Sequence, residues 1–173
     1  GLGPGNRPPL LGGFPGLSGA DPPGHRRDWE KELAEGRNTL PRRVLLGVTG
    51  SAAAFKGVAL ASALTKKGYE VDSVLTPSGE RFVGPAQLAS VTGRRVWTKM
   101  FGDPADHMPH ITLSEAADIL VVAPATADIM ARMACGLADG LLSALALAFS
   151  GPVVLAPSMN ERMWESPATT ENV

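Results

Sequence analysis

Small polar side chains recur at four places in the sequence, each directly after a run of apolar residues. These places are Thr49-Gly50-Ser51, Thr76-Pro77-Ser78, Pro124–Asp128 and Pro157–Asn160. Hydroxyl groups and free backbone N–H groups at a helix N-terminus can bind a phosphate. The same residue types also cap helices, so their spacing leaves phosphate binding and helix capping open as alternatives.

The first of these places lacks the common nucleotide-binding signatures. Residues 47–57 read GVTGSAAAFKG, which contains neither G-x-G-x-x-G nor G-x-x-x-x-G-K-[ST]. A dinucleotide fingerprint and an NTPase P-loop are therefore disfavoured. Several neutral hydroxyls without a group of lysines fit a phosphomonoester better than a triphosphate.

Two histidines and one asparagine are candidates for catalysis or substrate binding. His107 and His110 flank Met108-Pro109 in a segment that we expect to be a loop, and no cysteine or carboxylate cluster supports a metal site there. Either histidine could act as a base near neutral pH, and the spacing does not choose between them. Asn160 could hold a substrate carboxylate, or it could cap a helix beginning at Glu161.

Strand and helix patterns alternate from Pro41 onward. Strands are expected over Arg43–Thr49, Tyr69–Leu75, Arg94–Thr98, Asp118–Ala123 and Val153–Ala156. Helices are expected around Phe55–Leu64, over Pro85–Val91, and over Ala125–Phe149 with interruptions at Gly136 and Gly140. This alternation predicts an α/β fold, a flavodoxin/Rossmann-like open parallel sheet with helices on both faces.

The position of the ligand site follows from that fold. The runs at Asp118–Ala123 and Val153–Ala156 are apolar without alternation, so we expect both strands to be covered on both faces. Ligands of open parallel sheets bind where the carboxyl ends of the strands meet the loops. All four polar clusters follow strands, and we expect them to line one crevice.

Composition limits the classes of partner. The chain has 173 residues, 44% of them hydrophobic and 19% charged, with a formal net charge of −1. This balance argues against nucleic acid as a partner, because binding a polyanion needs a basic excess. No apolar run is long enough to span a membrane, no secretory signal is visible, and Cys135 is the single cysteine. We therefore expect a soluble, cytoplasmic protein.

The first forty residues differ from the rest. They contain nine of the twenty glycines and six of the fifteen prolines, so we expect residues 1–40 to form a flexible N-terminal arm before a domain at 41–173. Within the arm, His25–Glu35 could form a short helix. Trp29 and Leu33 would then share one face and could pack onto a neighbouring subunit.

The clusters together resemble the flavin-containing cysteine decarboxylases, most closely those that decarboxylate phosphopantothenoylcysteine in coenzyme A synthesis. Pro157–Trp164 looks like the P-x-M-N-x-x-M-W substrate motif of that family. Pro124–Ile129 looks like its P-A-S-A-N-T flavin motif, with Thr126 for Ser and Asp128 for Asn. His110–Leu113 resembles the H-I-x-L segment that carries the catalytic histidine. The resemblance extends over roughly residues 43–173.

The resemblance implies roles for particular residues. His110 would be the catalytic base, Asn160 would hold the substrate carboxylate, and Met163 would contact the substrate, although Met163 could equally pack in the core. FMN would be the cofactor, with contacts from Gly50, Ser51, Ala52, Thr76, Ser78, Phe82, Thr126, Ala127, Asp128 and Ser158.

The resemblance also implies a reaction. FMN would oxidise the cysteine thiol to a thioaldehyde, so that the carboxylate becomes β to a C=S group and CO2 can leave. The substrate would be 4′-phosphopantothenoylcysteine and the product 4′-phosphopantetheine. The alternatives are oxidative decarboxylation of a peptidyl C-terminal cysteine to an enethiol, and a non-catalytic flavin-binding subunit.

Two further expectations concern assembly and completeness. Members of the family form trimers or assemblies of trimers, so a homotrimer is expected. No cysteine follows Asn160 in this sequence, whereas phosphopantothenoylcysteine decarboxylases carry one on a lid beyond that motif. We therefore expect either a fragment of a longer protein, such as a fusion with the ligase that makes the substrate, or an enzyme that stops at the enethiol.

Overall fold

The computed structural model describes residues 43–102 and 108–173. The predicted arm at 1–40, with Trp29 and Leu33, lies outside the described residues, as does His107. The elements are, in chain order, β1 (Arg43–Val48), α2 (Ala54–Lys66), β2 (Glu70–Leu75), the 3-10 helix η1 (Gly79–Arg81), α3 (Pro85–Thr92), β3 (Val96–Trp97), α4 (Pro109–Ala116), β4 (Ile119–Ala125), α5 (Ala127–Ala134), α6 (Leu141–Ala148), β5 (Val153–Pro157), α7 (Glu161–Trp164) and α8 (Pro167–Glu171).

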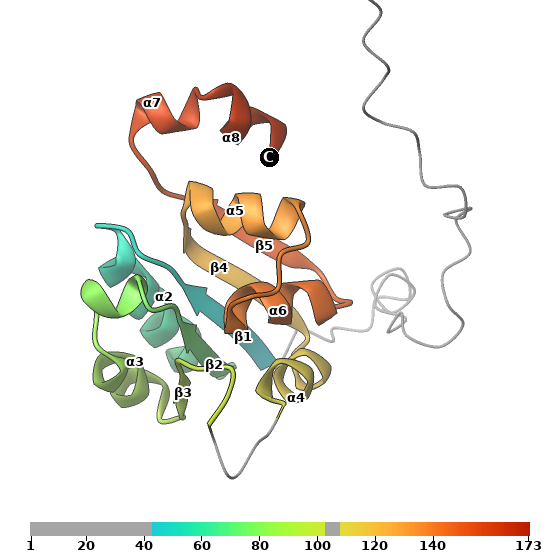
Figure 1. The fold of residues 1–173 in the computed structure, drawn as a ribbon. Coiled ribbons are helices and arrows are strands. Elements are labelled where there is room, and N and C mark those ends of the chain that lie inside the picture. Colours follow the sequence, from blue (N-terminus) through green and yellow to red (C-terminus); the bar gives the residue numbers. More distant parts are fainter. Residues whose placement is uncertain (1–42, 103–107) are drawn as a thin grey trace, which may run out of the picture.

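The strands form one parallel sheet in the order β3-β2-β1-β4-β5, which confirms the predicted open α/β fold (Figure 1). The chain runs from β1 outward to β3 and then returns to place β4 on the other side of β1. The strand order therefore reverses between β1 and β4, the position where open sheets bind ligands beyond the carboxyl ends of their strands.

Alternating side chains of the strands build a core on each face of the sheet. Leu46 and Val48 pack on the face that α2 and α3 cover, and Leu45 packs on the face of α4, α5 and α6. Helices thus cover both faces, as the sequence predicts. Helix α2 lies so close to β4 that a Cβ atom on Gly57 would be 2.6 Å from the carbonyl oxygen of Ala123.

Two helical predictions need correction. The single helix expected over Ala125–Phe149 is two helices, α5 and α6, because the chain turns at Gly136 with a φ of +67°. This break lies where the sequence placed an interruption. His110 lies in α4 rather than in a loop, since Pro109 is compatible with the first turn of a helix and begins it.

The prediction that β5 is covered on both faces is wrong. Val153 and Val154 are 40% and 47% exposed, and β5 is an edge strand of the described sheet. An apolar run shows that a strand can be buried, but the strand order decides what covers it. Within the described parts of the chain, no helix has the length and apolar character needed to cross a membrane.

Candidate functional site

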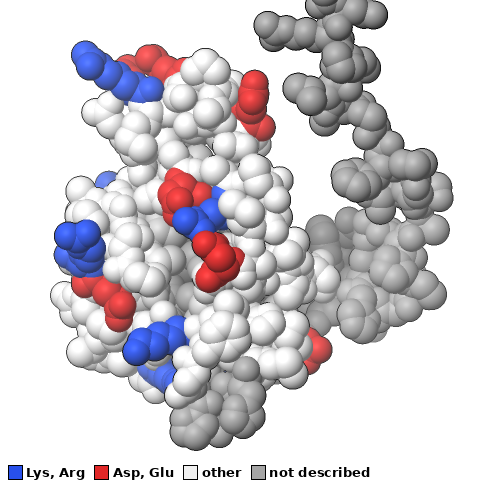
Figure 2. Space-filling model, in the orientation of Figure 1, with Lys and Arg blue, Asp and Glu red and all other residues white. Residues whose placement is uncertain are grey.

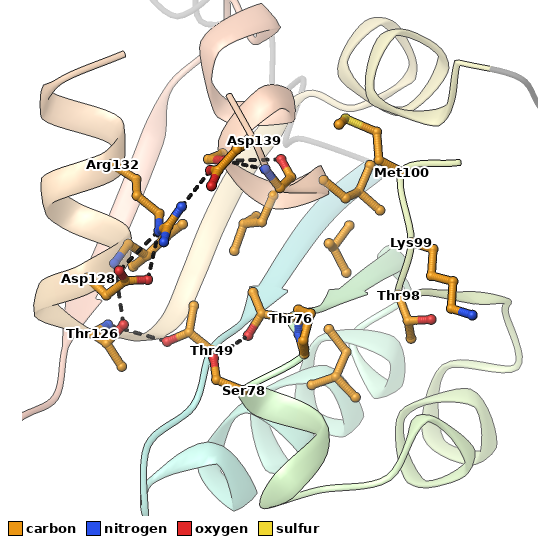
Figure 3. Close-up of a pocket in the computed structure, with 18 of the residues that line it drawn as sticks. Thr49, Thr76, Ser78, Thr98, Lys99, Met100, Thr126, Asp128, Arg132 and Asp139 are labelled. Carbon is orange, nitrogen blue, oxygen red and sulfur yellow. Dashed lines mark hydrogen bonds and ion pairs between the residues drawn. The ribbon is translucent and has the colours of Figure 1, made fainter. Parts of the chain in front are cut away.

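A cleft of about 670 Å³ opens at the carboxyl edge of the sheet (Figure 3). The segments after β1, β2, β3 and β4 line it together with the start of α6. Of the predicted site residues, the lining includes Thr76, Ser78, Thr126 and Asp128. It also includes Thr98, Lys99, Arg132 and Asp139, which the sequence did not predict.

Thr49 connects the two strand ends that flank the reversal of strand order. Its side chain is buried, donates a hydrogen bond to the carbonyl of Pro124 at 2.7 Å and accepts one from the amide of Thr126 at 3.3 Å. Thr126 in turn caps α5, because its Oγ1 accepts from the amide of Ile129 at 3.4 Å. Thr126 therefore caps a helix and also lines the cleft, so both predictions for this residue are confirmed.

The loops after β1 and β2 pack directly against each other. A Cβ atom on Gly50 would be 2.6 Å from Cβ of Ser78, so only glycine fits there. Thr76 and Ser78 place their hydroxyl oxygens 3.2 Å apart, and Thr76 Oγ1 accepts from the amide of Gly79 at 3.1 Å. Two of the predicted polar clusters are thus joined, with their hydroxyls at the cleft (Figure 3).

The fourth cluster joins the first through a pair of serines. The hydroxyl oxygens of Ser51 and Ser158 are 3.0 Å apart, and neither residue is part of the cleft lining. Ala52 is exposed, Ala127 begins α5 half-buried, and Phe82 ends η1 with 55% of its surface exposed. The predicted flavin-contacting residues therefore follow the carboxyl ends of β1, β2, β4 and β5, and only some of them line the cleft.

Arg132 forms ion pairs at one end of the cleft. Its Nε lies 3.0 and 2.9 Å from the two carboxylate oxygens of Asp128, and its Nη1 donates to Asp139 (Figure 3). The hydrogen bond from Arg132 holds the pKa of Asp139 below its usual value. The i, i+4 spacing of Asp128 and Arg132 could have indicated the first pair, whereas no local pattern points to Asp139.

His110 and Asn160 lie far apart within one chain. His110 lies in α4, which packs on α6, whereas Asn160 caps α7, which packs on α8. Figure 1 shows α4 and α7 at opposite ends of the molecule. Neither residue lines the cleft, and Met163 is half exposed on α7.

The side-chain polar atoms of the two residues have different surroundings. The Nδ1 atom of His110 is buried without a hydrogen-bond partner among the described residues. Asn160 uses its Oδ1 to cap α7, accepting from the amide of Arg162 at 3.0 Å. The capping interpretation of Asn160 is therefore confirmed. The cap does not use the NH2 group of this exposed side chain, so the group can donate to a ligand.

The charges around the cleft are mixed. Figure 2 shows Lys and Arg interspersed with Asp and Glu on this face of the molecule, with large uncharged areas between them. No cluster of residues able to hold a metal ion is found in the described ranges. The arrangement suits a small ligand with an apolar body and few charged groups.

An open parallel sheet with a hydroxyl-lined cleft at its carboxyl edge defines an α/β ligand-binding protein. The sequence matches the Flavoprotein family over residues 32–173, and the chain belongs to that family.

Several relatives are bifunctional proteins. The chain is 44% identical over 135 residues to the coenzyme A biosynthesis bifunctional protein CoaBC of Mycobacterium tuberculosis, covering 78% of this chain and 32% of that protein. It is 42% identical over 134 residues to CoaBC of Vibrio cholerae, covering 76% and 33% of the two chains. The chain thus spans about a third of the length of the curated relatives it matches.

Solved structures show the same fold. The FMN-dependent cysteine decarboxylase SpaF superposes with a TM-score of 0.70 at 36% identity, covering 75% of each chain. A cysteine-to-serine variant of a PPC decarboxylase, complexed with pantothenoylaminoethenethiol, superposes with a TM-score of 0.66 at 32% identity. That match covers 77% of this chain and 75% of the other.

Proposed function

We propose that this protein is an FMN-dependent carboxy-lyase that decarboxylates the cysteine moiety of 4′-phosphopantothenoylcysteine to give 4′-phosphopantetheine. The observation that carries the proposal is the 44% identity to a coenzyme A biosynthesis protein over most of this chain. The likeness to a PPC decarboxylase complexed with pantothenoylaminoethenethiol supports the same substrate class. Coenzyme A synthesis makes the cytoplasm the expected compartment.

The residues present fit FMN. A cleft of about 670 Å³ is within the range of small-molecule sites. The tight packing of Gly50 against Ser78 brings two loops together, so that Ser51, Thr76 and Ser78 would offer hydroxyls to the flavin phosphate. Thr126 and Asp128 line the same cleft and would also contact the cofactor. FMN, when bound, supplies the electron acceptor that makes loss of CO2 possible.

His110 and Asn160 would act on the substrate. Because Nδ1 of His110 is buried, the proton would be exchanged through Nε2. The side-chain NH2 of Asn160 would donate to the substrate carboxylate and orient it. An amide adds no charge, so it does not stabilise the carboxylate as strongly as an arginine would. The carboxylate then loses CO2 more readily.

The proposal includes a homotrimer or an assembly of trimers. His110 and Asn160 cannot meet in one chain, since α4 and α7 lie at opposite ends of the molecule (Figure 1). A second copy of the chain that brings its α7 to α4 would complete the site. The bifunctional relatives also support coupling to the ligase that makes the substrate.

A second function is favoured by one observation. The likeness to the FMN-dependent cysteine decarboxylase SpaF is as strong as that to the PPC decarboxylase, at 36% against 32% identity. The chain could therefore oxidatively decarboxylate a peptide that ends in cysteine. This reaction would end at an enethiol.

Mass spectrometry of the products distinguishes these functions. The FMN-loaded protein is incubated with phosphopantothenoylcysteine and, separately, with a peptide ending in cysteine. Loss of CO2 alone from the first substrate supports complete decarboxylation. Loss of CO2 and two hydrogens means that the reaction stops at the enethiol. Turnover of the peptide alone supports the second function, and a flavin-loaded protein that leaves both substrates unchanged contradicts both and indicates a non-catalytic flavin-binding subunit.

A further inference from the structure

The charged side chains of the cleft lie at its two ends. The lining includes Lys99, Asp128, Arg132 and Asp139. Arg132 pairs with both carboxylates, so this group carries a net charge of −1. Lys99 is exposed, and in the described ranges its ammonium group has no ion pair or hydrogen bond. The cleft therefore has an acidic end and a basic end.

The sheet order sets the distance between these ends. Lys99 follows β3 and Asp128 follows β4, with β2 and β1 between them. Neighbouring strands are about 4.8 Å apart, so three spacings separate the two strand ends by about 14 Å. Figure 3 shows Lys99 and Asp128 on opposite sides of the cleft. An elongated ligand can reach both ends.

A smaller hollow of about 250 Å³ adjoins the basic end. It shares Thr98, Lys99 and Phe101 with the main cleft, and its other side chains include Arg95 and Trp97. The guanidinium carbon of Arg95 lies 3.9 Å from the centre of the Trp97 ring, which holds this cation at the wall of the hollow. Of the described residues that line the hollow, none is acidic. The charged side chains among these lining residues, Arg95 and Lys99, are both cations.

We infer that Lys99 binds the phosphomonoester of the substrate. The inference rests on the proposed function and names the part of the site that recognises the phosphorylated end. A phosphate at the opposite end would meet the excess carboxylate of the Asp128–Arg132–Asp139 group, whereas at this end it meets the ammonium group of Lys99. A lysine binds phosphate as a point charge without a fixed geometry.

The proposed binding site of the flavin phosphate is separate from Lys99. The hydroxyls of Thr76 and Ser78 line the cleft after β2, between its two charged ends, and Ser51 follows β1 just outside the lining. A phosphate of FMN bound there leaves Lys99 to the second ligand. Lys99 would then favour a phosphorylated substrate over a peptide ending in cysteine, which has no phosphate.

Calorimetric binding to the FMN-loaded protein tests this assignment without requiring turnover. The probes are 4′-phosphopantetheine and pantetheine, which differ only by the phosphate. The variants are Lys99→Ala, Lys99→Arg and the control Lys67→Ala, which removes a cation at the far end of α2. We expect the wild type to bind the phosphorylated probe more tightly, and Lys99→Ala to lose roughly tenfold of that preference. Lys99→Arg and Lys67→Ala should keep it.

Other results overturn the inference. It fails if the wild type binds the two probes equally or binds neither, or if Lys99→Ala weakens both to the same extent. A parallel titration with FMN and riboflavin identifies the source of the phosphate: if Lys99→Ala weakens only FMN, the lysine belongs to the flavin site and the assignment is wrong. Decarboxylation by the wild type is assayed separately. A wild type that does not decarboxylate contradicts the proposed function, and the role of Lys99 is still supported if the preference for the phosphorylated probe is lost in Lys99→Ala.

Discussion

The two ring nitrogens of His110 have different surroundings, and this difference limits what the residue can do. Nδ1 is buried without a hydrogen-bond partner among the described residues, so a substrate cannot reach this nitrogen. Asn160 similarly uses one side-chain atom for the cap of α7 and presents the other outward. At both residues one side-chain atom is therefore withdrawn from a substrate, by burial at His110 and by the cap at Asn160.

A substitution at His110 should separate binding from catalysis. We expect His110→Gln to lower the decarboxylation rate at least about 100-fold, because glutamine cannot exchange the proton. FMN binding should be unchanged, since His110 does not line the cleft. Product formation is followed by mass spectrometry and FMN binding by fluorescence quenching. His107→Gln is the matched control, and loss of activity in that variant instead would assign the base to His107.

Two buried hydroxyls should differ in their effect on stability. Thr49 joins β1 to β4 through two hydrogen bonds, whereas the buried Ser73 hydroxyl has no partner among the described residues. Thr49→Val leaves a carbonyl and an amide without hydrogen-bond partners and should lower the free energy of unfolding by about 1–3 kcal/mol. Ser73→Ala should leave it unchanged or raise it by about 1 kcal/mol. Urea unfolding measures both. Equal losses in the two variants would contradict this account.

Arg132 connects helix α5 to the segment before α6 through two ion pairs. One guanidinium holds Asp128 on the helix and Asp139 in that segment, and both carboxylates stand at the cleft. The side chains are largely exposed, so the pairs contribute little stability. Their effect is to fix where this wall of the cleft lies.

The ionisation of Asp139 reports on this link. Its pKa is lowered in the folded protein, mainly by the hydrogen bond from Arg132, so the ion pair stabilises the fold above the ordinary carboxyl pKa. That contribution is lost as the pH falls through the lowered pKa. Carbon-detected NMR titration should show Asp139 titrating below its usual range in the wild type and returning toward it in Arg132→Gln. An unchanged pKa in the variant would refute the link.

At the scale of the molecule, one chain leaves apolar surface open where α7 and β5 lie. Val153 and Val154 on β5 and Met163 and Trp164 on α7 are between 40% and 50% exposed. Exposed apolar groups of this kind mark interaction surfaces. The separation of His110 from Asn160 within one chain supports an assembly in which copies share active sites.

Mixing two inactive variants tests that assembly. His110→Gln and Asn160→Ala should each be inactive alone. If each site takes His110 from one copy and Asn160 from another, reassembled equimolar mixtures should regain about a quarter of the wild-type activity. Sedimentation of the wild type should give a trimer or a multiple of it. A monomer, or mixtures that stay inactive, would exclude shared sites.

The alternation of strands and helices, the parallel sheet and the position of each polar cluster after a strand could be predicted from the amino-acid sequence. These are local properties: apolar runs specify strands, and polar residues after them lie at the carboxyl edge of a parallel sheet. Helix capping by Thr126 and Asn160 could also be proposed from the sequence, because a cap involves residues that are neighbours in the chain.

Which of these residues lie close together could be learned only from the tertiary structure. Strand order places β5 at an edge and exposes it, although its sequence reads like that of a buried strand. Folding pairs Arg132 with Asp139, sets Lys99 opposite them and separates α4 from α7. These relations join residues distant in the chain, and no periodicity encodes them because they depend on how whole elements pack.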